Sequence, residues 1–306
     1  MVSKSELDSS LKMKQQVLVS VVMITYNHEN YIEEAVNGVL MQKTDFAYEL
    51  IVANDQSTDQ TDSVIKRILS EHPLSSRVHY IEREKNMGMI ANFIGTVRQS
   101  KGKYIALCEG DDYWTDPFKL QKQVDFLEQN EEYSLVCHDA QIIDEVSGKT
   151  YRDFTSPDQK QICSTKDLFG SNFCTTASIL FRKESISSFE LPEFKVLTGD
   201  LFLKLLVSLD GLLFRMYEVM SVHRITATGA TMTLKRNMPE LIRSRILLFD
   251  YFNKVSGKKF DKYLRIEILL LKSYLDHLNS KSFVKTVLLK VYMKTLFIKR
   301  KRVFRN

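Results

Sequence analysis

The chain has 306 residues, of which 44% are hydrophobic and 26% are charged, and its formal net charge at pH 7 is +5. This composition excludes a largely disordered protein and supplies enough apolar side chains for one large domain, with or without an appended subdomain. The C-terminal residues, "LFIKRKRVFRN", form a basic tail instead of spreading charge over a domain. Because nucleic-acid-binding domains usually carry a basic face, we expect no nucleic-acid partner.

The cysteine pattern and the N-terminus favour a cytoplasmic protein. The four cysteines lack CxxC or any other spacing of metal ligands, which favours reduced thiols; they are Cys108, Cys137, Cys163 and Cys174. Residues 1–16 are polar and charged, without the apolar stretch of a signal peptide. No segment approaches the roughly 20 uninterrupted apolar residues that a membrane-spanning helix needs.

The first half of the chain alternates strand patterns with helix patterns. The stretch "VLVSVVMIT" at 17–25 is typical of a strand buried on both faces. Further strands are predicted at 48–55, 78–83 and 103–109, and helices at 29–41, 59–69 and 88–99. Regular alternation with short connections implies right-handed crossovers, and hence an α/β fold with a mostly parallel sheet flanked by helices.

The second half is less regular. It predicts a helix at 117–130, a strand at 133–140, a hairpin at 142–154, a strand at 175–183, a helix at 199–209 and an extended stretch at 211–225. Three helical segments follow, at 239–255, 260–279 and 282–298. We therefore expect a main domain over residues 1–232 and a helical C-terminal extension with the basic tail over residues 233–306.

Polar side chains follow three of the predicted strands. Thr25, Tyr26 and Asn27 follow the first strand, Asp55 follows the second, and Glu109, Asp111 and Asp112 follow the fourth. In open α/β sheets, ligands bind just beyond the carboxyl ends of the strands. These residues therefore predict a binding site at one edge of the sheet.

The acids of "ALCEGDDYWTDP" indicate a bound cation. Carboxylates this close together do not all remain charged without compensation. Oxygen ligands suit Mg²⁺ or Mn²⁺, and such an ion would be shared with a substrate diphosphate. The alternative is a solvated acidic turn in front of the helix that begins near Pro117, with Asp116 as its N-cap.

Asp55 has two interpretations. An aspartate after the second strand accepts hydrogen bonds from a ribose or a base in many nucleotide-binding folds. It also serves as an N-cap or in an Asx-turn before the next helix. The sequence has neither a GxGxxG after the first strand nor a GxxxxGK[ST] motif, so a dinucleotide fold and a P-loop are not supported.

Together these segments resemble the family 2 glycosyltransferases, a group with the GT-A fold that includes bacterial surface-polysaccharide enzymes. The resemblance runs from about Val19 to Thr233. It rests on segments in the family's order, which include "VSVVMITYNHENYIEEAVNGVLMQ", "YELIVANDQSTDQT", "NMGMIANF", "KGKYIALCEGDDYWTDPFKLQKQVDFLE" and "TGDLFLKLL". It implies a Rossmann-like GT-A catalytic domain over residues 1–232.

The resemblance assigns the binding of a nucleoside-diphosphate sugar to the strand ends. The residues implied to bind the donor are Thr25, Tyr26, Asn27, Asp55, Asn86, Gly88, Glu109 and Asp111. Asn86 and Gly88 would shape the loop over the base and ribose. Asp111 and Asp112 would hold Mn²⁺ or Mg²⁺ on the diphosphate, and Glu109 stands where the family often has the first aspartate of its DxD motif.

On the acceptor side, the resemblance implies that Asp200 is the catalytic base. Many relatives have Glu-Asp there, whereas this chain has Gly199 before the aspartate. The alternative for Asp200 is an acid in the first turn of a helix. Relatives often have a metal-binding histidine where this chain has Thr226. His223 lies three residues earlier, and we expect it to be structural.

The implied function is transfer of a sugar from a nucleoside-diphosphate sugar, most often a UDP-sugar, with inversion at the anomeric carbon. The acceptor would be a glycan or a lipid-linked saccharide of a surface polysaccharide. The alternatives are a sugar nucleotidyltransferase, a glycosidase and a non-catalytic GT-A-like interaction module. The mixed basic and apolar residues of 283–306 predict contact with the cytoplasmic face of the inner membrane, or else an ordinary docked helix.

Overall fold

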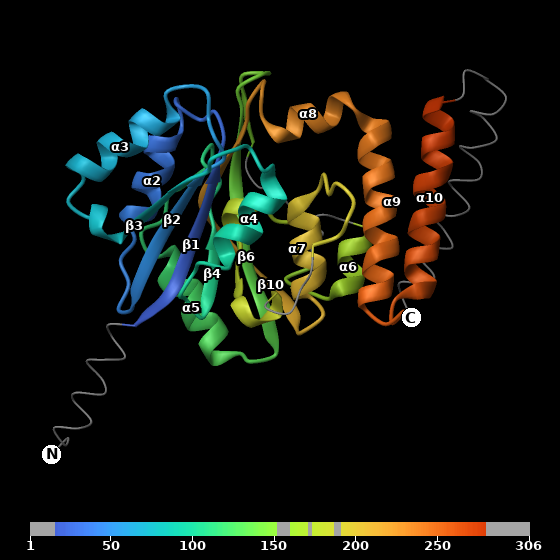
Figure 1. Ribbon diagram of the computed structural model, residues 1–306. Helices are drawn as coiled ribbons and strands as arrows, with labels where there is room; N and C mark the ends of the chain where they lie inside the picture. Colours follow the sequence, from blue (N-terminus) through green and yellow to red (C-terminus); the bar gives the residue numbers. More distant parts are fainter. Residues whose placement is uncertain (1–15, 152–159, 171–172, 187–190, 280–306) are drawn as a thin grey trace, which may run out of the picture.

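The computed structural model describes residues 16–151, 160–170, 173–186 and 191–279. Within these residues the strands form one sheet in the order β3-β2-β1-β4-β9-β6-β10-β5, with β7 beside β6 and β8 beside β10. Figure 1 shows this sheet in the middle of the molecule, with helices on both of its faces. The predicted α/β class is confirmed.

The longer strands of the sheet run in the same direction, whereas the short strands β5, β7, β8 and β9 pair antiparallel to their neighbours. β1 pairs in parallel with β2 and β4, β2 with β3, and β6 with β10. β9 is antiparallel to both β4 and β6, so the long strands still end at one common edge. The strands are β1 (Val17–Thr25), β2 (Ala47–Asn54), β3 (Val78–Glu82), β4 (Tyr104–Leu107), β5 (Tyr113–Trp114), β6 (Tyr133–Asp144), β7 (Lys149–Tyr151), β8 (Ile162–Cys163), β9 (Leu180–Arg182) and β10 (Leu212–Ile225).

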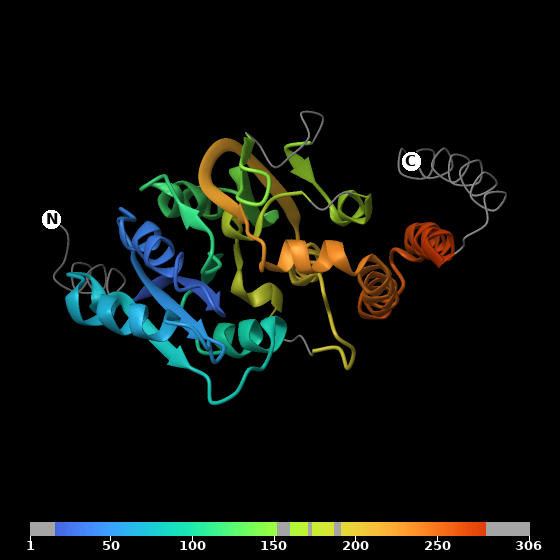
Figure 2. The same cartoon turned by 90° about the horizontal axis from the view of Figure 1, so that it is seen from above.

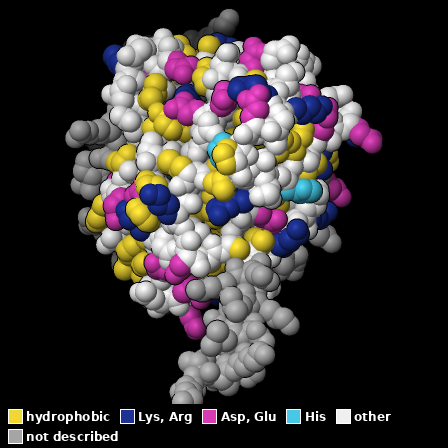
Figure 3. Space-filling view, turned by 90° about the vertical axis from the view of Figure 1, so that its left-hand side faces the viewer, with side chains coloured by type: hydrophobic (Ala, Val, Ile, Leu, Met, Phe, Trp, Pro, Cys, Tyr) yellow, Lys and Arg dark blue, Asp and Glu magenta, His cyan; other side chains and the backbone are white. Residues whose placement is uncertain are grey.

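The described helices form two layers around the sheet. They are α2 (Ile32–Leu40), α3 (Thr61–Glu71), α4 (Met89–Val97), α5 (Lys119–Gln129), α6 (Thr165–Gly170), α7 (Gly199–Val207), α8 (Ala230–Arg236), α9 (Met238–Val255) and α10 (Asp261–Asn279). Side chains of α2, α3 and α5 belong to one apolar cluster, and those of α6, α7, α9 and α10 belong to the other. On the left-hand side of Figure 1, acidic and basic side chains are interspersed, as is typical of a solvated surface (Figure 3).

The two clusters follow from the alternation of side chains along β1. Val19, Val21 and Met23 point into the cluster with α2 and α3, whereas Val22 points into the cluster with α7. All four side chains are at most 2% exposed. The continuous apolar run of "VLVSVVMIT" therefore marks a strand covered on both faces, as predicted, and β1 has the predicted bounds.

The strand predicted at 175–183 is wrong over most of its length. A 3₁₀ turn occupies Thr176–Ser178, and only Leu180–Arg182 forms a strand. The carbonyls of this turn accept side-chain hydrogen bonds, from the Trp114 indole to Ala177 (2.8 Å) and from the Gln123 amide to Ser178 (2.9 Å). Because these side chains satisfy the carbonyls, the turn needs no neighbouring strand.

The C-terminal helices pack as a pair at one end of the molecule. Figure 2 shows α9 and α10 next to each other, at the opposite end from α2 and α3. Phe249 and Phe252 of α9 pack against Phe169 of α6 with their rings edge to face, so the C-terminal helices share the core of the sheet domain. The domain boundary predicted at residue 232 falls inside α8.

Part of the C-terminal prediction cannot be compared with the structure. The helix predicted at 282–298 and the membrane contact predicted for 283–306 lie outside the described residues. Among the helices that the structure describes, none combines the length and the hydropathy that crossing a bilayer requires.

Lys119 at the start of α5 is an uncommon feature of the core. Its side chain is completely buried, and its Nζ donates to Gln123 Oε1 (2.7 Å) and lies 4.0 Å from the ring centre of Trp114. Burial lowers the pKa of Lys119 from 10.5 to about 7. The folded chain therefore releases this proton near neutral pH, whereas the unfolded chain keeps it up to pH 10.5.

Replacement of Lys119 by methionine is expected to remove a pH dependence of stability. Between pH 7 and pH 10.5 the unfolded wild type binds the extra proton, so its free energy of unfolding rises with pH in this window. Relative to Lys119→Met, the wild type should gain on the order of 1 kcal/mol per pH unit between pH 7.5 and 9. Urea unfolding at several pH values measures this difference. A difference in the free energy of unfolding that does not change with pH would contradict this prediction. Lys122→Met is the control, because the side chain of Lys122 is 40% exposed.

Candidate active site

The strand ends at the carboxyl edge of the sheet are joined by backbone hydrogen bonds. The amide of Asp55 donates to the carbonyl of Thr25 (2.9 Å), and the amide of Gly110 donates to the carbonyl of Ile24 (3.1 Å). These bonds place the residues after β2 and β4 on either side of the end of β1. The structure thus brings together the three polar groups that the sequence predicted at strand ends.

Asp55 holds the loop in front of α4. Its two carboxylate oxygens accept hydrogen bonds from the amides of Met87 and Gly88, each at 2.8 Å, and its side chain is buried. The Asn86 amide group donates to the Asp55 carbonyl (3.1 Å), and Gly88 has a φ of +81°, which favours glycine. The predicted donor residues of this region therefore form one unit, in which the Asp55 carboxylate shapes the loop.

The residues after β1 differ in exposure. Thr25 is buried, and its hydroxyl lies 3.2 Å from His28 Nδ1. Tyr26 is 44% exposed, so its ring is available to contact a ligand. Asn27 adopts a positive φ of 58°, and its side-chain oxygen accepts a hydrogen bond from the Thr58 amide (2.8 Å). Asn27 thus fixes the segment after β2, while Tyr26 presents a free surface.

The three acids after β4 lie in different environments. Asp112 is completely buried, accepts a hydrogen bond from the Arg224 amide (2.9 Å), and lies 3.0 Å from His223 Nδ1. Asp111 is half-buried, with its Oδ2 3.8 Å from His28 Nε2. Among the described residues, none donates a hydrogen bond to the Glu109 carboxylate. Asp112 is thus bound to β10, while Glu109 and Asp111 keep oxygens free.

Burial and mutual repulsion act on the protonation of these groups. Burial, followed by the charges of Asp111 and Asp112, raises the pKa of Glu109 to about 8. Burial also raises the pKa of Asp111 above its usual range. Burial alone would lower the pKa of His223, but the Asp112 carboxylate raises it to about 9, so this imidazole is charged at neutral pH. The cluster therefore attracts positive charge.

Gly110 is required by the close approach of β1 to this turn. A Cβ atom at position 110 would lie 2.6 Å from Thr25 Oγ1 and 2.7 Å from His28 Nδ1, which is closer than such atoms approach. The turn "EGDD" therefore depends on the missing side chain to bring Glu109 and Asp111 against the end of β1.

Arg224 connects the acid-bearing turn to its surroundings. Its guanidinium donates to the carbonyl of Asp111 (2.8 Å) and forms an ion pair with Glu34 of α2. The same group lies 5.2 Å from the ring centre of Tyr31 and 4.5 Å from that of Tyr113. Arg224 is only 8% exposed. It thereby fixes the turn against α2 and β10.

The donor set of the cluster fits a divalent cation that is shared with a ligand. In the part of the chain that the structure describes, no three His, Cys, Asp or Glu side chains are arranged to hold a metal by themselves. Glu109 and Asp111 nevertheless offer carboxylate oxygens in a site that attracts cations. Mg²⁺ and Mn²⁺ sites of this kind use one or two carboxylates and take other ligands from phosphate and water.

Asp200 lies in the first turn of α7, as predicted, and has a buried cation beside it. The Nζ of Lys204, one turn further along the helix, is 3.2 Å from Asp200 Oδ2. The same Nζ donates to the carbonyls of Phe173 (2.9 Å) and Cys174 (3.2 Å). Burial alone would lower the pKa of Lys204, but Asp200 raises it above its usual value. Lys204 therefore stays charged and holds Asp200 at the helix start.

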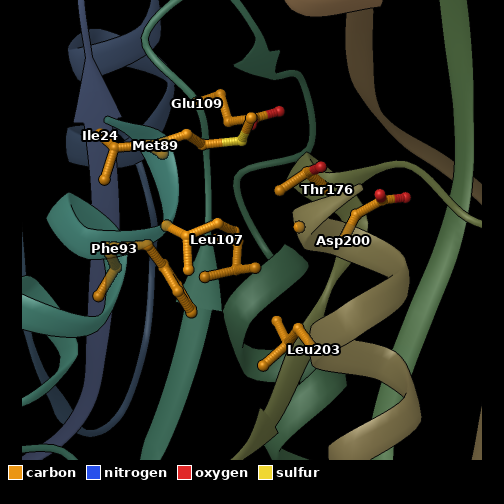
Figure 4. A pocket seen from close by; sticks show the side chains of 11 residues that line it. Ile24, Met89, Phe93, Leu107, Glu109, Thr176, Asp200 and Leu203 are labelled. Carbon is orange, nitrogen blue, oxygen red and sulfur yellow. The ribbon is translucent and has the colours of Figure 1, made fainter. Parts of the chain in front are cut away.

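A cavity of about 40 Å³ lies between the two acidic regions. Figure 4 shows Glu109, Thr176 and Asp200 at its mouth, with Leu107, Phe93 and Leu203 at its other end. Ile24 and Met89 lie across from Asp200 in the same view. The cavity thus joins the strand-end acids of β4 to the start of α7, and its inner part is apolar.

Sequence reasoning missed several residues of this site. The contact of His223, expected to be structural, with Asp112 was not foreseen. Lys204 was not singled out because a lysine on an amphipathic helix is usually solvated. Arg224 and His28 carried no motif signal. The only signal for His223 was its place near the end of a predicted extended stretch, in "VHRI".

The fold is the GT-A fold. A solved structure of Staphylococcus aureus TarS in complex with UDP-GlcNAc matches with a TM-score of 0.64 and 16% identity, over 83% of this chain and 72% of that one. The mannosyltransferase PcManGT from Pyrobaculum calidifontis, in complex with GDP-Man and Mn²⁺, matches with a TM-score of 0.59 and 16% identity, over 94% of this chain and 83% of that one.

A model of the family described as glycosyl transferase family 2 matches residues 20–189, more than half of the chain. The chain therefore belongs to glycosyltransferase family 2, which confirms the family predicted from the motifs.

The chain is also similar to curated proteins. An uncharacterised protein of Mycobacterium tuberculosis is 36% identical over 211 residues, which is 69% of this chain and 60% of that protein. Bacillus subtilis TuaG, named a putative teichuronic acid biosynthesis glycosyltransferase, is 31% identical over 133 residues, 42% of this chain and 51% of TuaG. The chain thus spans about half to three fifths of the length of these curated relatives.

Replacement of Lys204 by methionine is expected to destabilise the fold. The carbonyls of Phe173 and Cys174 would lose a buried donor, which should lower the free energy of unfolding by about 2 kcal/mol. Urea unfolding measures the loss. Asp200→Asn keeps both carbonyl contacts but removes the counter-ion of a buried cation, so its loss of stability measures the ion pair separately from the carbonyl contacts. A Lys204→Met variant as stable as wild type would show that the two carbonyls do not need this lysine.

Proposed function

We propose that the protein is an inverting glycosyltransferase that transfers a sugar from a nucleoside-diphosphate sugar to the hydroxyl of an acceptor. One observation carries this proposal: a cavity lies between Glu109, which follows β4, and Asp200, which begins α7. The cavity is next to the loop of residues 86–88 that Asp55 orders. A donor whose nucleoside lies at that loop would extend its diphosphate past Glu109 and Asp111. Its sugar would then reach Asp200.

The nucleoside would be bound between the exposed ring of Tyr26 and the loop of Asn86 and Gly88. The amides of Met87 and Gly88 are already used by Asp55, so this loop is ordered before the nucleotide binds. Such an ordered loop lowers the entropy lost on binding. Thr25 and Asn27 would support the site indirectly. Thr25 contacts His28, and Asn27 fixes the segment after β2.

Asp200 would act as the general base. The acceptor oxygen attacks the anomeric carbon from the side opposite to the diphosphate, forming the new glycosidic bond while the bond from that carbon to the diphosphate oxygen breaks. The acceptor proton passes to the Asp200 carboxylate, and the nucleoside diphosphate leaves with the bonding electron pair. One displacement of this kind inverts the configuration at the anomeric carbon. Lys204 keeps the carboxylate in place during this transfer.

Asp111 and Glu109 would hold a Mn²⁺ or Mg²⁺ ion that neutralises the charge on the departing diphosphate. Asp112 has a different part in this proposal from the one predicted, because His223 and Arg224 occupy its oxygens. In this proposal Asp112 holds the turn of residues 109–112 in position through its contacts with β10. PcManGT is a protein of this fold whose structure contains Mn²⁺ with GDP-Man.

The donor and the acceptor are proposed from the related proteins. TarS was solved with UDP-GlcNAc, which supports a UDP-sugar as the first donor to test. The family assignment is supported by TuaG and by EpsE, a putative glycosyltransferase of Bacillus subtilis that is 31% identical over 156 residues. The name of TuaG supports a cell-surface polysaccharide as the acceptor. We propose action at the cytoplasmic side, where nucleotide sugars are made.

The experiment that tests the function incubates the protein with UDP-, GDP- and dTDP-sugars and Mn²⁺, and follows release of the nucleoside diphosphate. Asp200→Asn should lower this release by about 10³-fold while leaving the dissociation constant of the donor within about threefold of wild type, because only proton transfer is lost. Calorimetry measures the binding. Exchange of labelled pyrophosphate instead of nucleoside diphosphate release would favour a nucleotidyltransferase.

The two aspartates of the turn should respond differently to substitution. Asp111→Asn should abolish the gain in UDP affinity that Mn²⁺ provides, because it removes an ionised ligand of the proposed ion. Asp112→Asn should weaken Mn²⁺-dependent binding by only about 10-fold, because it acts through the position of the turn. Calorimetric titration of UDP with Mn²⁺ and with EDTA measures both. Unchanged Mn²⁺ dependence in Asp111→Asn would remove Asp111 from the metal site.

A further inference from the structure

The inner part of the cavity between β1, β4, α4 and α7 has no polar side chain. The side chains with polar atoms, Glu109, Thr176 and Asp200, lie at the mouth. The inner end is formed by Phe93, Leu107 and Leu203, and Val22 also lines the cavity. A group that enters this end meets apolar side chains.

The cavity has room for a small group. Its volume is about 40 Å³, whereas a single water needs roughly 10–15 Å³ on the same scale. A hydroxyl that entered would lose its water and find no side-chain partner, which costs free energy. A methyl group would gain from the same burial.

The close approach of Ile90 to the start of α7 depends on the absence of a side chain at position 199. A Cβ atom on Gly199 would lie 2.6 Å from Ile90 Cδ1. Ile90 therefore packs directly against the backbone at the start of α7, and any side chain at 199 would displace it. Both residues line the cavity next to Asp200.

The position of the cavity connects it to the donor more closely than to the acceptor. Ile24 directly precedes Thr25, Leu107 lies two residues before Glu109, and Met89 follows Gly88. These lining residues thus continue the segments proposed to bind the nucleotide. A sugar held between Glu109 and Asp200 would direct one of its substituents into the inner end.

We propose that this cavity is a subsite for the methyl group of a 6-deoxyhexose, so that the donor is a nucleoside-diphosphate 6-deoxy sugar. The exocyclic C6 is the one carbon that projects from a pyranose ring and so the one that fills the inner end. In a hexose C6 bears a hydroxyl, which this end leaves unpaired. In an N-acetylhexosamine the acetamido group adds an amide that also lacks partners there. This inference rests on the proposed glycosyltransferase function.

The test compares donors that differ only at C6. The pairs are UDP-glucose with UDP-6-deoxyglucose, dTDP-glucose with dTDP-6-deoxyglucose, and GDP-mannose with GDP-6-deoxymannose, each titrated by calorimetry and assayed for nucleoside diphosphate release with Mn²⁺. For the base that the protein accepts, the 6-deoxy sugar should have a kcat/KM about 10- to 100-fold higher than its partner. Equal values, or a preference for the hexose or for UDP-GlcNAc, would overturn the subsite and leave the transferase function intact. If no nucleotide sugar binds or reacts, the proposed function itself fails.

A matched pair of variants locates the preference in this cavity. Leu107→Thr and Leu107→Val shorten the same side chain of the inner end and differ only in that threonine adds a hydroxyl to the cavity wall. Leu107→Val should keep the preference for the 6-deoxy sugar, whereas Leu107→Thr should reduce it by about 10-fold, because the C6 hydroxyl gains a partner. The same preference in both variants would show that discrimination arises elsewhere. Thermal unfolding of each variant checks that the fold is retained.

Discussion

Repulsion among three carboxylates at the end of β4 is the constraint on which the site depends. Glu109, Asp111 and Asp112 occupy four consecutive positions with Gly110, and burial makes their charges costly. The structure separates them. Asp112 turns inward and is neutralised by the charged imidazole of His223, Asp111 lies near His28, and Glu109 faces the cavity. One acid is thus compensated by the protein, which leaves the other two to interact with a ligand.

This arrangement requires distant parts of the chain to meet at one edge. β10 runs beside β6 over its whole length, and shifts of register near Met216 and Val219 bend it before it reaches the acids. Its last residues then supply His223 and Arg224. On the opposite side of the cavity, Lys204 connects α7 to the carbonyls of 173 and 174. The groups near the proposed reaction are therefore held by strands and a helix, while the loop of Asn86 and Gly88 is held by the side chains of Asp55 and Gln56.

Much of this edge could be predicted from the sequence, because it depends on local patterns. The apolar run of β1, the alternation of strands and helices, and the polar residues at the strand ends all follow from spacing along the chain. The strand predicted at 175–183 failed because Trp114 and Gln123, more than fifty residues away in sequence, satisfy the carbonyls of the turn that replaces it. The partners of Asp112 were missed for the same reason, whereas Lys204, one turn from Asp200, was missed because a lysine on an amphipathic helix is usually solvated. Pairing of His223 with Asp112 depends on the bend of β10, which has no signature in the sequence.

Arg224 shows how far such an edge depends on residues outside any motif. It contacts α2 through Glu34 and Tyr31, β5 through Tyr113, and the backbone of Asp111. A lysine would preserve the charge but not the planar fork that makes these contacts together. During evolution, exchange at this position could inactivate a copy of the gene while every recognisable signature residue remained. An intact set of signature residues is therefore a poor criterion for deciding which homologues are still working enzymes.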